Sequence, residues 1–530
     1  MRKIILLMLL SSVISAAYSN TSDAEIKLSD KICTNNRTDG FFSRIVGDNS
    51  KHIYALFFNH SYEEKIGFAV REKYKVILFN KKNMKREGEL ILKGFGLSKE
   101  DHKKVRSMYL INVYVKEDFL YVLWALQNGK VVRFYVQVFN KDLKSDTELK
   151  KVYERPKEDF FYGGFTFKSF KGFLSEKNDD LVLVSGLRDK SLKLKNLDVV
   201  VVHKTLETEV LNRFKLPVSL IDVDGMSYER TVFERSKYDG DLYFTYEKND
   251  VIGYGRIDLN GGHLEHNWIS SDKKITSVNI HSAGNQIQVF GTCKKENEEN
   301  GDELSFYSFS VDKKLFMETE IKYTPVSLNI LGRKKKVKLT YQNQEAIIGD
   351  DLGVVFFISF KDLGLLGSGN SFLLMAKTDA QGYLLWSRQI DLRSYGSKMG
   401  NSMFVKKNTS GFSVFIFDAL KWMGPNGAIT FPRKIVCLKI EKDGTYDGQE
   451  IDLRSKGIDD LLSIRMPSLY QSEYENSSDG GYYFMTQKIT YTATFFLALI
   501  ANAPVCFNPF IVDYDDTMEG DVRLGQIIVK

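Results

Sequence analysis

Two histidines in the segment GGHLEHNW, His263 and His266, are the residues that most resemble part of a metal site. A zinc site needs three or four converging ligands, and no CxxC pair accompanies these histidines. Residues three apart in a strand face opposite sides of a sheet, so a shared ion would require a bulge or turn. We therefore expect a solvated hairpin turn here, and the sequence predicts no metal ligand and no cofactor-binding residue.

Other catalytic signatures are missing from the sequence as well. No Ser-His-Asp order, P-loop or G-x-G-x-x-G context occurs. A glycosidase would need two carboxylates facing one site, and nothing singles out two of the 68 acidic residues. The sequence therefore predicts no catalytic residue, and an enzymatic function stays an alternative.

The densest basic run is RKKKVK, from Arg333 to Lys338. Such a run could contact phosphate, anionic lipid or an acidic polymer. It has no interleaved aromatic residues for stacking on bases, and the net charge of the whole chain is only +6. We interpret it as a charged loop between structural units and expect no nucleic-acid partner.

The first nineteen residues have the pattern of a secretory signal peptide. Arg2 and Lys3 precede an apolar run, and small residues follow up to Ala17 or Ser19. The mature chain is therefore expected to be secreted, or to lie in the periplasm or at the cell surface. An uncharged run at 489–512 is interrupted by Pro504 and Pro509, so two buried strands are favoured over an exposed apolar loop and no membrane span is expected after cleavage.

The chain contains a repeat. Eight short runs are rich in β-branched and aromatic residues, and their starts are 45 to 70 residues apart: HIYALFF from 52, FLYVLWALQ from 119, LVLVSGL from 181, LYFTYE from 242, IQVFGTC from 287, VVFFISF from 354, FSVFIFD from 412 and YYFMTQK from 482. Most are followed by two further strand patterns separated by a polar turn, as in FLLMAKTDAQGYLLWSRQI. One more candidate strand, such as SMYLINVYV, precedes most of them.

Four strands per unit, repeated about eight times, predict an all-β protein with one large β-propeller. We divide the chain into a signal peptide at 1–19, an N-terminal extension at 20–40 and a propeller at 41–530. The 45-residue spacing before IQVFGTC leaves seven blades as the main alternative, and a pair of β-sandwiches is a further one.

Three segments resemble parts of a blade repeat of secreted and cell-surface bacterial propellers, in which S-D-G-G-Y precedes one strand and K-T-D-x-x-G-x-x-x-W closes the blade. SSDGGYYF matches the first half, and NTSGF at 408–412 carries a shortened version of it. The second half is matched by Lys377, Thr378, Asp379, Gly382 and Trp386. The resemblance implies that these stretches are blade corners and that Trp386 packs between blades. The earlier blades have charged turns instead, such as NKKNMK and NKDLKS.

The cysteines fit this organisation. Cys437 lies inside the strand pattern KIVCLKI and is expected to be a buried small hydrophobe. If the ring closes through its two ends, Cys33 and Cys506 come close together, and we hypothesise that they form a disulfide.

We expect a binding or protein-interaction module at the cell envelope, with a protein or glycan partner and a monomeric state. Rigid blades would display recognition loops, with candidates at 60–73, 154–180, 294–303, 324–350 and 419–433. The alternative is a glycosidase-like or lyase-like enzyme that acts on a carbohydrate or another small polar substrate at the centre of the ring.

Overall fold

The computed structural model of this chain describes thirty stretches of the sequence. They are residues 24–30, 32–34, 41–61, 71–92, 107–128, 130–147, 149–156, 170–174, 180–188, 194–203, 205–211, 214–215, 232–236, 239–248, 251–270, 274–283, 286–294, 303–311, 317–322, 327–330, 333–336, 339–364, 367–392, 400–408, 410–424, 427–453, 470–471, 481–487, 490–491 and 518–529.

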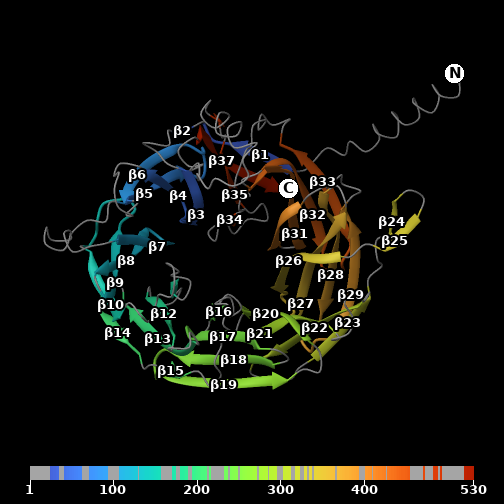
Figure 1. The fold of residues 1–530 in the computed structure, drawn as a ribbon, viewed down its shortest axis with the longest axis horizontal. Helices are drawn as coiled ribbons and strands as arrows, with labels where there is room; N and C mark the ends of the chain where they lie inside the picture. The colour runs from blue at the N-terminus through green and yellow to red at the C-terminus, as the bar shows by residue number, and fades with distance from the viewer. Residues whose placement is uncertain are drawn as a thin grey trace, which may run out of the picture.

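Eight antiparallel sheets form the blades of a closed ring (Figure 1). Blade one holds β3 (Phe41–Asp48), β4 (His52–Ser61), β5 (Arg71–Asn80) and β6 (Arg86–Leu92). Blade two holds β7 (Ser107–Lys116), β8 (Phe119–Asn128), β9 (Val131–Phe139) and β10 (Lys150–Pro156). Blade three holds β11 (Phe170–Leu174), β12 (Leu181–Arg188), β13 (Leu194–Val202) and β14 (Thr208–Val210), with β15 (Phe214–Lys215) also paired to β13. Blade four holds β16 (Val232–Arg235), β17 (Leu242–Lys248), β18 (Val251–Asp258) and β19 (His263–Ser270).

The second half of the ring follows the same order. Blade five holds β20 (Lys274–Ala283), β21 (Gln286–Lys294), β22 (Glu303–Ser310) and β23 (Met317–Lys322). Blade six holds β26 (Leu339–Ile348), β27 (Val354–Gly364), β28 (Gly367–Thr378) and β29 (Leu384–Asp391). Blade seven holds β30 (Gly400–Lys407), β31 (Gly411–Gly424), β32 (Gly427–Glu441) and β33 (Tyr446–Asp452). Each of the eight apolar runs found in the sequence forms the second strand of one blade, so the eight-bladed propeller is confirmed.

The two ends of the chain build blade eight together. Its strands are β34 (Tyr470–Gln471), β35 (Tyr482–Gln487), β37 (Met518–Val529) and, from the N-terminus, β1 (Ala24–Leu28). β1 pairs with β37 from Ala24 opposite Val529 to Leu28 opposite Gly525, and β2 (Ile32–Thr34) and β36 (Thr490–Tyr491) also pair with β37. Part of the segment 20–40, which we expected to precede the propeller, thus supplies strands that close the ring.

The seven-bladed alternative is wrong, and short connections explain the spacing that suggested it. Between the second strands of blades four and five, the chain crosses between strands at 249–250, 259–262, 271–273 and 284–285. Blade five therefore starts soon after blade four without any loss of a strand.

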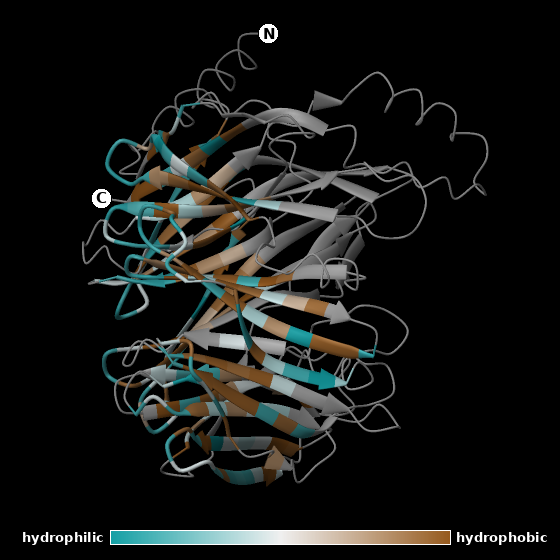
Figure 2. Ribbon diagram, turned by 90° about the vertical axis from the view of Figure 1, so that its left-hand side faces the viewer, coloured by the Kyte–Doolittle hydropathy of each residue, from teal (hydrophilic) through white to brown (hydrophobic). Residues whose placement is uncertain are grey.

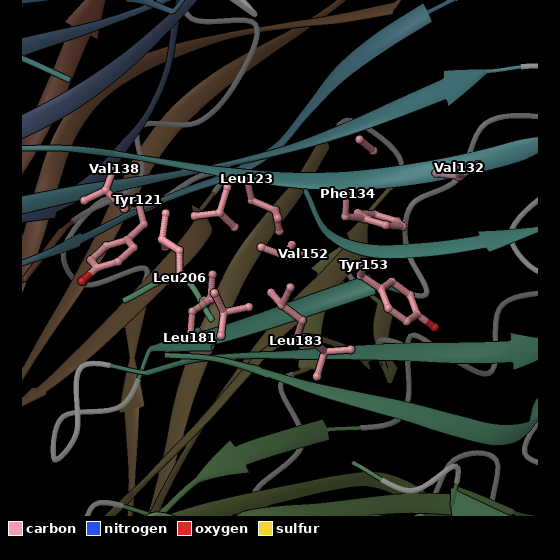
Figure 3. Packing of buried hydrophobic residues seen from close by; sticks show 14 residues of the cluster. Tyr121, Leu123, Val132, Phe134, Val138, Val152, Tyr153, Leu181, Leu183 and Leu206 are labelled. Atoms are coloured by element: carbon pink, nitrogen blue, oxygen red, sulfur yellow. The ribbon is translucent and has the colours of Figure 1, made fainter. Parts of the chain in front are cut away.

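The core lies between neighbouring blades, where alternate residues of each strand face the next sheet. Figure 3 shows one such cluster, in which Tyr121 and Phe134 of blade two pack near Leu181 and Leu183 of blade three. Leu123, Phe134 and Leu183 are fully buried, and burial of a large apolar side chain contributes about 1.5–3 kcal/mol. Figure 2 shows these apolar strand centres in brown and the turns along one side in teal.

The turn between the third and fourth strands repeats from blade to blade. In blades one, two, four and six its first side chain, Asn80, Asn140, Asp258 or Asp379, accepts hydrogen bonds from backbone amides two to four residues ahead. In blade seven Asp443, in the middle of the turn, accepts one from the backbone amide of Thr445. The residue with positive φ is a glycine in blades four, six and seven: Gly262, Gly382 and Gly444. It is Met84, Leu143 or Leu206 in blades one to three. The charged turns of the early blades are therefore variants of one corner.

Two expected loops are wrong. Most of 419–433 is strand, because β31 and β32 stay paired from Ala419 opposite Pro432 to Gly424 opposite Gly427. The basic run is also not a plain loop, since Arg333–Lys336 forms β25, which pairs with β24 (Ser327–Ile330) in a hairpin between blades five and six (Figure 1).

Candidate functional site

The described residues with the clearest capacity to bind a ligand lie on the innermost strands of blades one to three. Arg44 belongs to β3, Asn112 and Tyr114 to β7, and Gly172 to β11. The Arg44 guanidinium donates a hydrogen bond through Nη2 to Oδ1 of Asn112. The hydroxyl of Tyr114 lies over Gly172, where a Cβ atom would be 2.2 Å from it. Three consecutive blades thus contribute to one polar cluster, which we call the Arg44 cluster.

Bulges in the innermost strands place these side chains. The pairing of β3 with β4 shifts between Phe42 and Arg44, and the pairing of β7 with β8 shifts between Leu110 and Asn112. A bulge inserts one residue and changes the direction in which the next side chain points. Arg44 and Asn112 each follow a bulge directly. The bulges explain why these polar side chains do not point into the apolar core between blades.

Arg44 is the charged member of the cluster. Its side chain is exposed, yet surrounding protein lowers its pKa by desolvation, against a smaller opposing effect of Tyr114. None of the ion pairs among the described residues includes Arg44. A partly desolvated guanidinium that no described carboxylate neutralises favours an anion supplied by a ligand.

Tyr114 is the neutral member of the cluster. Burial raises the pKa of its hydroxyl, against the opposing effects of Asn112, Arg44 and the backbone of Gly172. At neutral pH the phenol therefore stays protonated and can donate a hydrogen bond. Guanidinium, amide and phenol together could bind a carboxylate or sulfate oxygen and a neighbouring hydroxyl group.

A second group of titratable side chains lies on the innermost strands of blades four and five. Nδ1 of His281 in β20 is 3.4 Å from Oε1 of Glu234 in β16, and the backbone amide of Ser282 donates to the same oxygen at 3.4 Å. A histidine oriented by a carboxylate is a common proton acceptor. This pair could transfer a proton to or from a bound ligand.

The two histidines singled out in the sequence have no group of further metal-ligating side chains beside them among the described residues. Both belong to the strand β19 and not to a turn, and His266 is half-buried, with its Nε2 2.7 Å from the hydroxyl of Tyr246. The hairpin turn expected there lies at 259–262 and includes both glycines of GGHLEHNW, but the two histidines follow it in the strand. Among the described residues no group of three or more His, Cys, Asp or Glu side chains could hold a metal ion.

Other residues singled out in the sequence have structural roles. Cys437 is buried in β32, as predicted, and burial raises the pKa of its thiol to about 12. Trp386 packs between blades six and seven, also as predicted. Backbone pairing places Cys33 opposite Asp521 in blade eight, but Cys506 lies outside the described residues, so the disulfide stays a prediction.

The apolar run 489–512 lies almost wholly outside the described residues, apart from Thr490 and Tyr491 in β36. Within the part of the chain that the structure describes, no helix is long and apolar enough to cross a membrane.

The Arg44 cluster was not predicted from the sequence. The only local signal is a polar residue inside an apolar first strand, as in FFSRIVGD and SMYLINVYVK. Neither segment indicates where its strand bulges or which blade lies beside it. The contact between Arg44 and Asn112 depends on the bulges and on the neighbouring blade.

Comparison with known proteins shows no family for this chain. No protein-family model matches the chain, and no curated protein matches it. Among solved structures, the chain is similar to the polysaccharide lyase Uly1, with 10% identity, a TM-score of 0.41 and coverage of 95% of this chain and 100% of that one. A PL25 ulvan lyase bound to -[GlcA(1-4)Rha3S]- matches with 11% identity, a TM-score of 0.37 and coverage of 70% and 90%.

A third match is the Pyrococcus horikoshii acylaminoacyl peptidase, with 10% identity and a TM-score of 0.35 over 86% of this chain and 59% of that one. At such identities and TM-scores these likenesses assign no activity to the chain. Its class is that of eight-bladed β-propellers, and its function has to be argued from its own residues.

Proposed function

We propose that this protein is a binding propeller that holds an oxyanion-bearing sugar, a sugar acid or a sugar sulfate, at the Arg44 cluster. The observation that carries the proposal is the exposed Arg44 guanidinium, which contacts Asn112 across two blades and takes part in no ion pair among the described residues. The innermost strands of a ring suit a small molecule or a narrow polymer better than a globular surface.

The cluster also explains why a sugar fits. Arg44 would bind the charged oxygens, and the Tyr114 hydroxyl would bind a hydroxyl group of the sugar. A hydrogen bond to a charged group contributes about 1.5–3 kcal/mol, which is about a tenfold to 150-fold effect on the dissociation constant.

A panel of acidic, sulfated and neutral oligosaccharides immobilised on one surface tests the proposal. The mature wild-type protein should bind acidic or sulfated members and not their neutral counterparts, and Arg44→Gln should lose that preference. Arg133→Gln is the matched control, since Arg133 lies on β9 and forms an ion pair with Glu154. Equal binding of neutral and acidic members would contradict the proposal.

A second candidate function is enzymatic, and the pair of His281 and Glu234 favours it. A base at the centre of the ring could remove a proton from a bound sugar acid, and the neutral Tyr114 could donate one. A purified protein that cleaves any acidic polysaccharide, with loss of cleavage in His281→Ala and Glu234→Gln, would establish this function. Binding without cleavage by a folded protein would leave the binding propeller as the function.

The location and state of assembly belong to the same proposal. The signal peptide pattern at 1–19 supports export, so we place the mature protein outside the cytoplasm, secreted or at the cell envelope, as a monomer. Cell fractionation with sizing of the purified protein tests both points, and retention in the cytoplasm would contradict the first of them.

A further inference from the structure

A row of side chains on the outermost strand of blade four has no role in the proposed function. On β19, His266, Trp268 and Ser270 point to the same face because residues two apart share a face in a strand. Trp268 is 61% exposed, although burial of an indole is strongly favourable. We call these three residues the β19 row; β19 forms the outer edge of the ring in Figure 1.

Aromatic packing beneath the row fixes its geometry. The hydroxyl of Tyr246 is 2.7 Å from Nε2 of His266, and the two rings stack with centroids 5.7 Å apart at 11°. The ring of Phe244 also stacks on this imidazole, with centroids 6.4 Å apart at 23°. The His266 ring in turn lies 6.0 Å from the ring of Trp268.

Two glycines make this packing possible. Gly255 pairs with His266 and Gly253 pairs with Trp268 across the β18–β19 ladder. A Cβ atom at Gly253 would lie 2.0 Å from the ring of Tyr246, and one at Gly255 would lie 2.5 Å from the ring of Phe244. The rings of β17 therefore lie across the glycines and reach His266, which holds the neighbouring indole beside a rigid imidazole.

A single exposed aromatic residue needs no explanation by itself. Tyr383, at the start of blade six's outer strand, is 62% exposed, and no ring contact joins it to another described residue. The β19 row differs because its indole is supported by a stack of three rings and is followed by a hydroxyl group on the same face. Rigid aromatic surface binds with a small loss of conformational entropy.

We propose that the β19 row binds a neutral sugar ring, with the apolar face of the sugar on Trp268 and its hydroxyl groups toward His266 and Ser270. A pyranose has one face of C–H groups and a rim of hydroxyl groups, which matches a flat indole flanked by polar atoms. No charged side chain belongs to the row, so the ligand needs no charge. This site lies on the outside of blade four and does not depend on the Arg44 cluster.

Co-sedimentation of the full mature protein with insoluble cellulose, chitin and β-1,3-glucan tests the site. The wild-type protein should bind at least one of these polymers, and Trp268→Ala should weaken that binding by about tenfold or more. Trp268→Phe should retain part of it, because a smaller ring keeps the apolar face. Tyr383→Ala is the matched control for loss of an exposed ring, and Arg44→Gln separates this site from the proposed function; both should bind like the wild type.

Three binding results would overturn the proposal. They are a wild-type protein that binds none of the polymers, a Trp268→Ala variant that binds as the wild type does, and a Tyr383→Ala variant that loses as much binding. A concentration-dependent dimer that Trp268→Ala abolishes would also overturn it, because the row would then contact a second copy. Thermal unfolding of each variant checks folding, and Trp268→Phe keeps the test decisive if the alanine variant is unstable.

Discussion

Trp386 of blade six reaches into blade seven, where its Nε1 donates a hydrogen bond to the carbonyl oxygen of Lys442 at 3.0 Å. Gly444 of the same turn lies against the indole, and a Cβ atom there would be 2.8 Å from the ring. Lys442 also lies 3.8 Å from Asp350 of blade six, which pairs with Lys407 of blade seven. One corner of blade seven is therefore tied to blade six by a ring, a hydrogen bond and two ion pairs.

Gly444→Ala should destabilise the protein more than Gly240→Ala. Both glycines have similar positive φ values, +84° and +81°, but no atom lies within 4 Å of a Cβ at Gly240. Gly240→Ala should therefore lower the free energy of unfolding by about 1–2 kcal/mol, which is the strain of a non-glycine residue in the left-handed region. Gly444→Ala should add about 1–3 kcal/mol for the displaced indole. Urea unfolding gives both values, and equal losses would show that the Trp386 contact has little energetic weight.

Two positive-φ residues of the early blades, Leu206 and Leu143, should respond differently to replacement by glycine. Leu206 is buried and packs between blades two and three, so Leu206→Gly should lose about 2–4 kcal/mol of packing and regain only about 1 kcal/mol of backbone strain. Leu143 is only partly buried, so in Leu143→Gly the two effects should nearly cancel. Differential scanning calorimetry compares the two, and a more stable Leu206→Gly variant would contradict this balance.

Gly172→Ala should damage the Arg44 cluster. The added Cβ would lie 2.2 Å from the Tyr114 hydroxyl and 3.3 Å from Leu183, so the phenol must move. Binding of the acidic sugar should weaken severalfold while the fold is retained. Gly88→Ala is the control, because a Cβ there meets only Leu143 at an ordinary 3.6 Å. Unchanged affinity in Gly172→Ala, measured by calorimetry, would remove Tyr114 from the site.

Glu87 predicts an acid-sensitive corner in blade one. Hydrogen bonds with His52, Lys51 and Asn80 lower its pKa from 4.5 to about 2. Because the folded-state pKa is depressed, the carboxylate contributes stability above pH 4.5 and loses it as the pH falls toward 2. Glu87→Gln should make the loss of stability between pH 5 and pH 2 shallower, as followed by urea midpoints. A Glu87→Gln variant that loses stability as steeply as the wild type between pH 5 and pH 2 would contradict this account.

The fold could be predicted because its signals are local. Runs such as VVFFISF and LYFTYE have the length and composition of buried strands, and Asp379 with Gly382 forms the turn that its residue types favour. The closing strand β1 is different. It is short and contains Glu25 and Lys27, so nothing in its sequence distinguishes it from an extension. Its role depends on a partner, β37, at the other end of the chain.

The candidate sites could not be predicted in the same way. A shift of one residue in a strand moves every following side chain to the other face, and the bulges before Arg44 and Asn112 leave no clear signature in FFSRIVGD or SMYLINVYVK. The sequence predicts a candidate recognition loop at 419–433, yet only 425–426 lies between the paired strands β31 and β32. The pairing between strands determines both the direction of the side chains in the Arg44 cluster and the length of the β31–β32 hairpin.

The measurement that tests the central claim most directly is a calorimetric double-mutant cycle at Arg44. The best-bound sugar acid and its carboxyl-reduced, neutral counterpart would each be titrated into the wild-type protein and Arg44→Gln. We predict that the variant binds the acid at least about tenfold more weakly and binds the neutral sugar as the wild type does, so that the coupling is confined to the charged pair. Equal losses for both sugars, or none for the acid, would contradict an oxyanion site at Arg44.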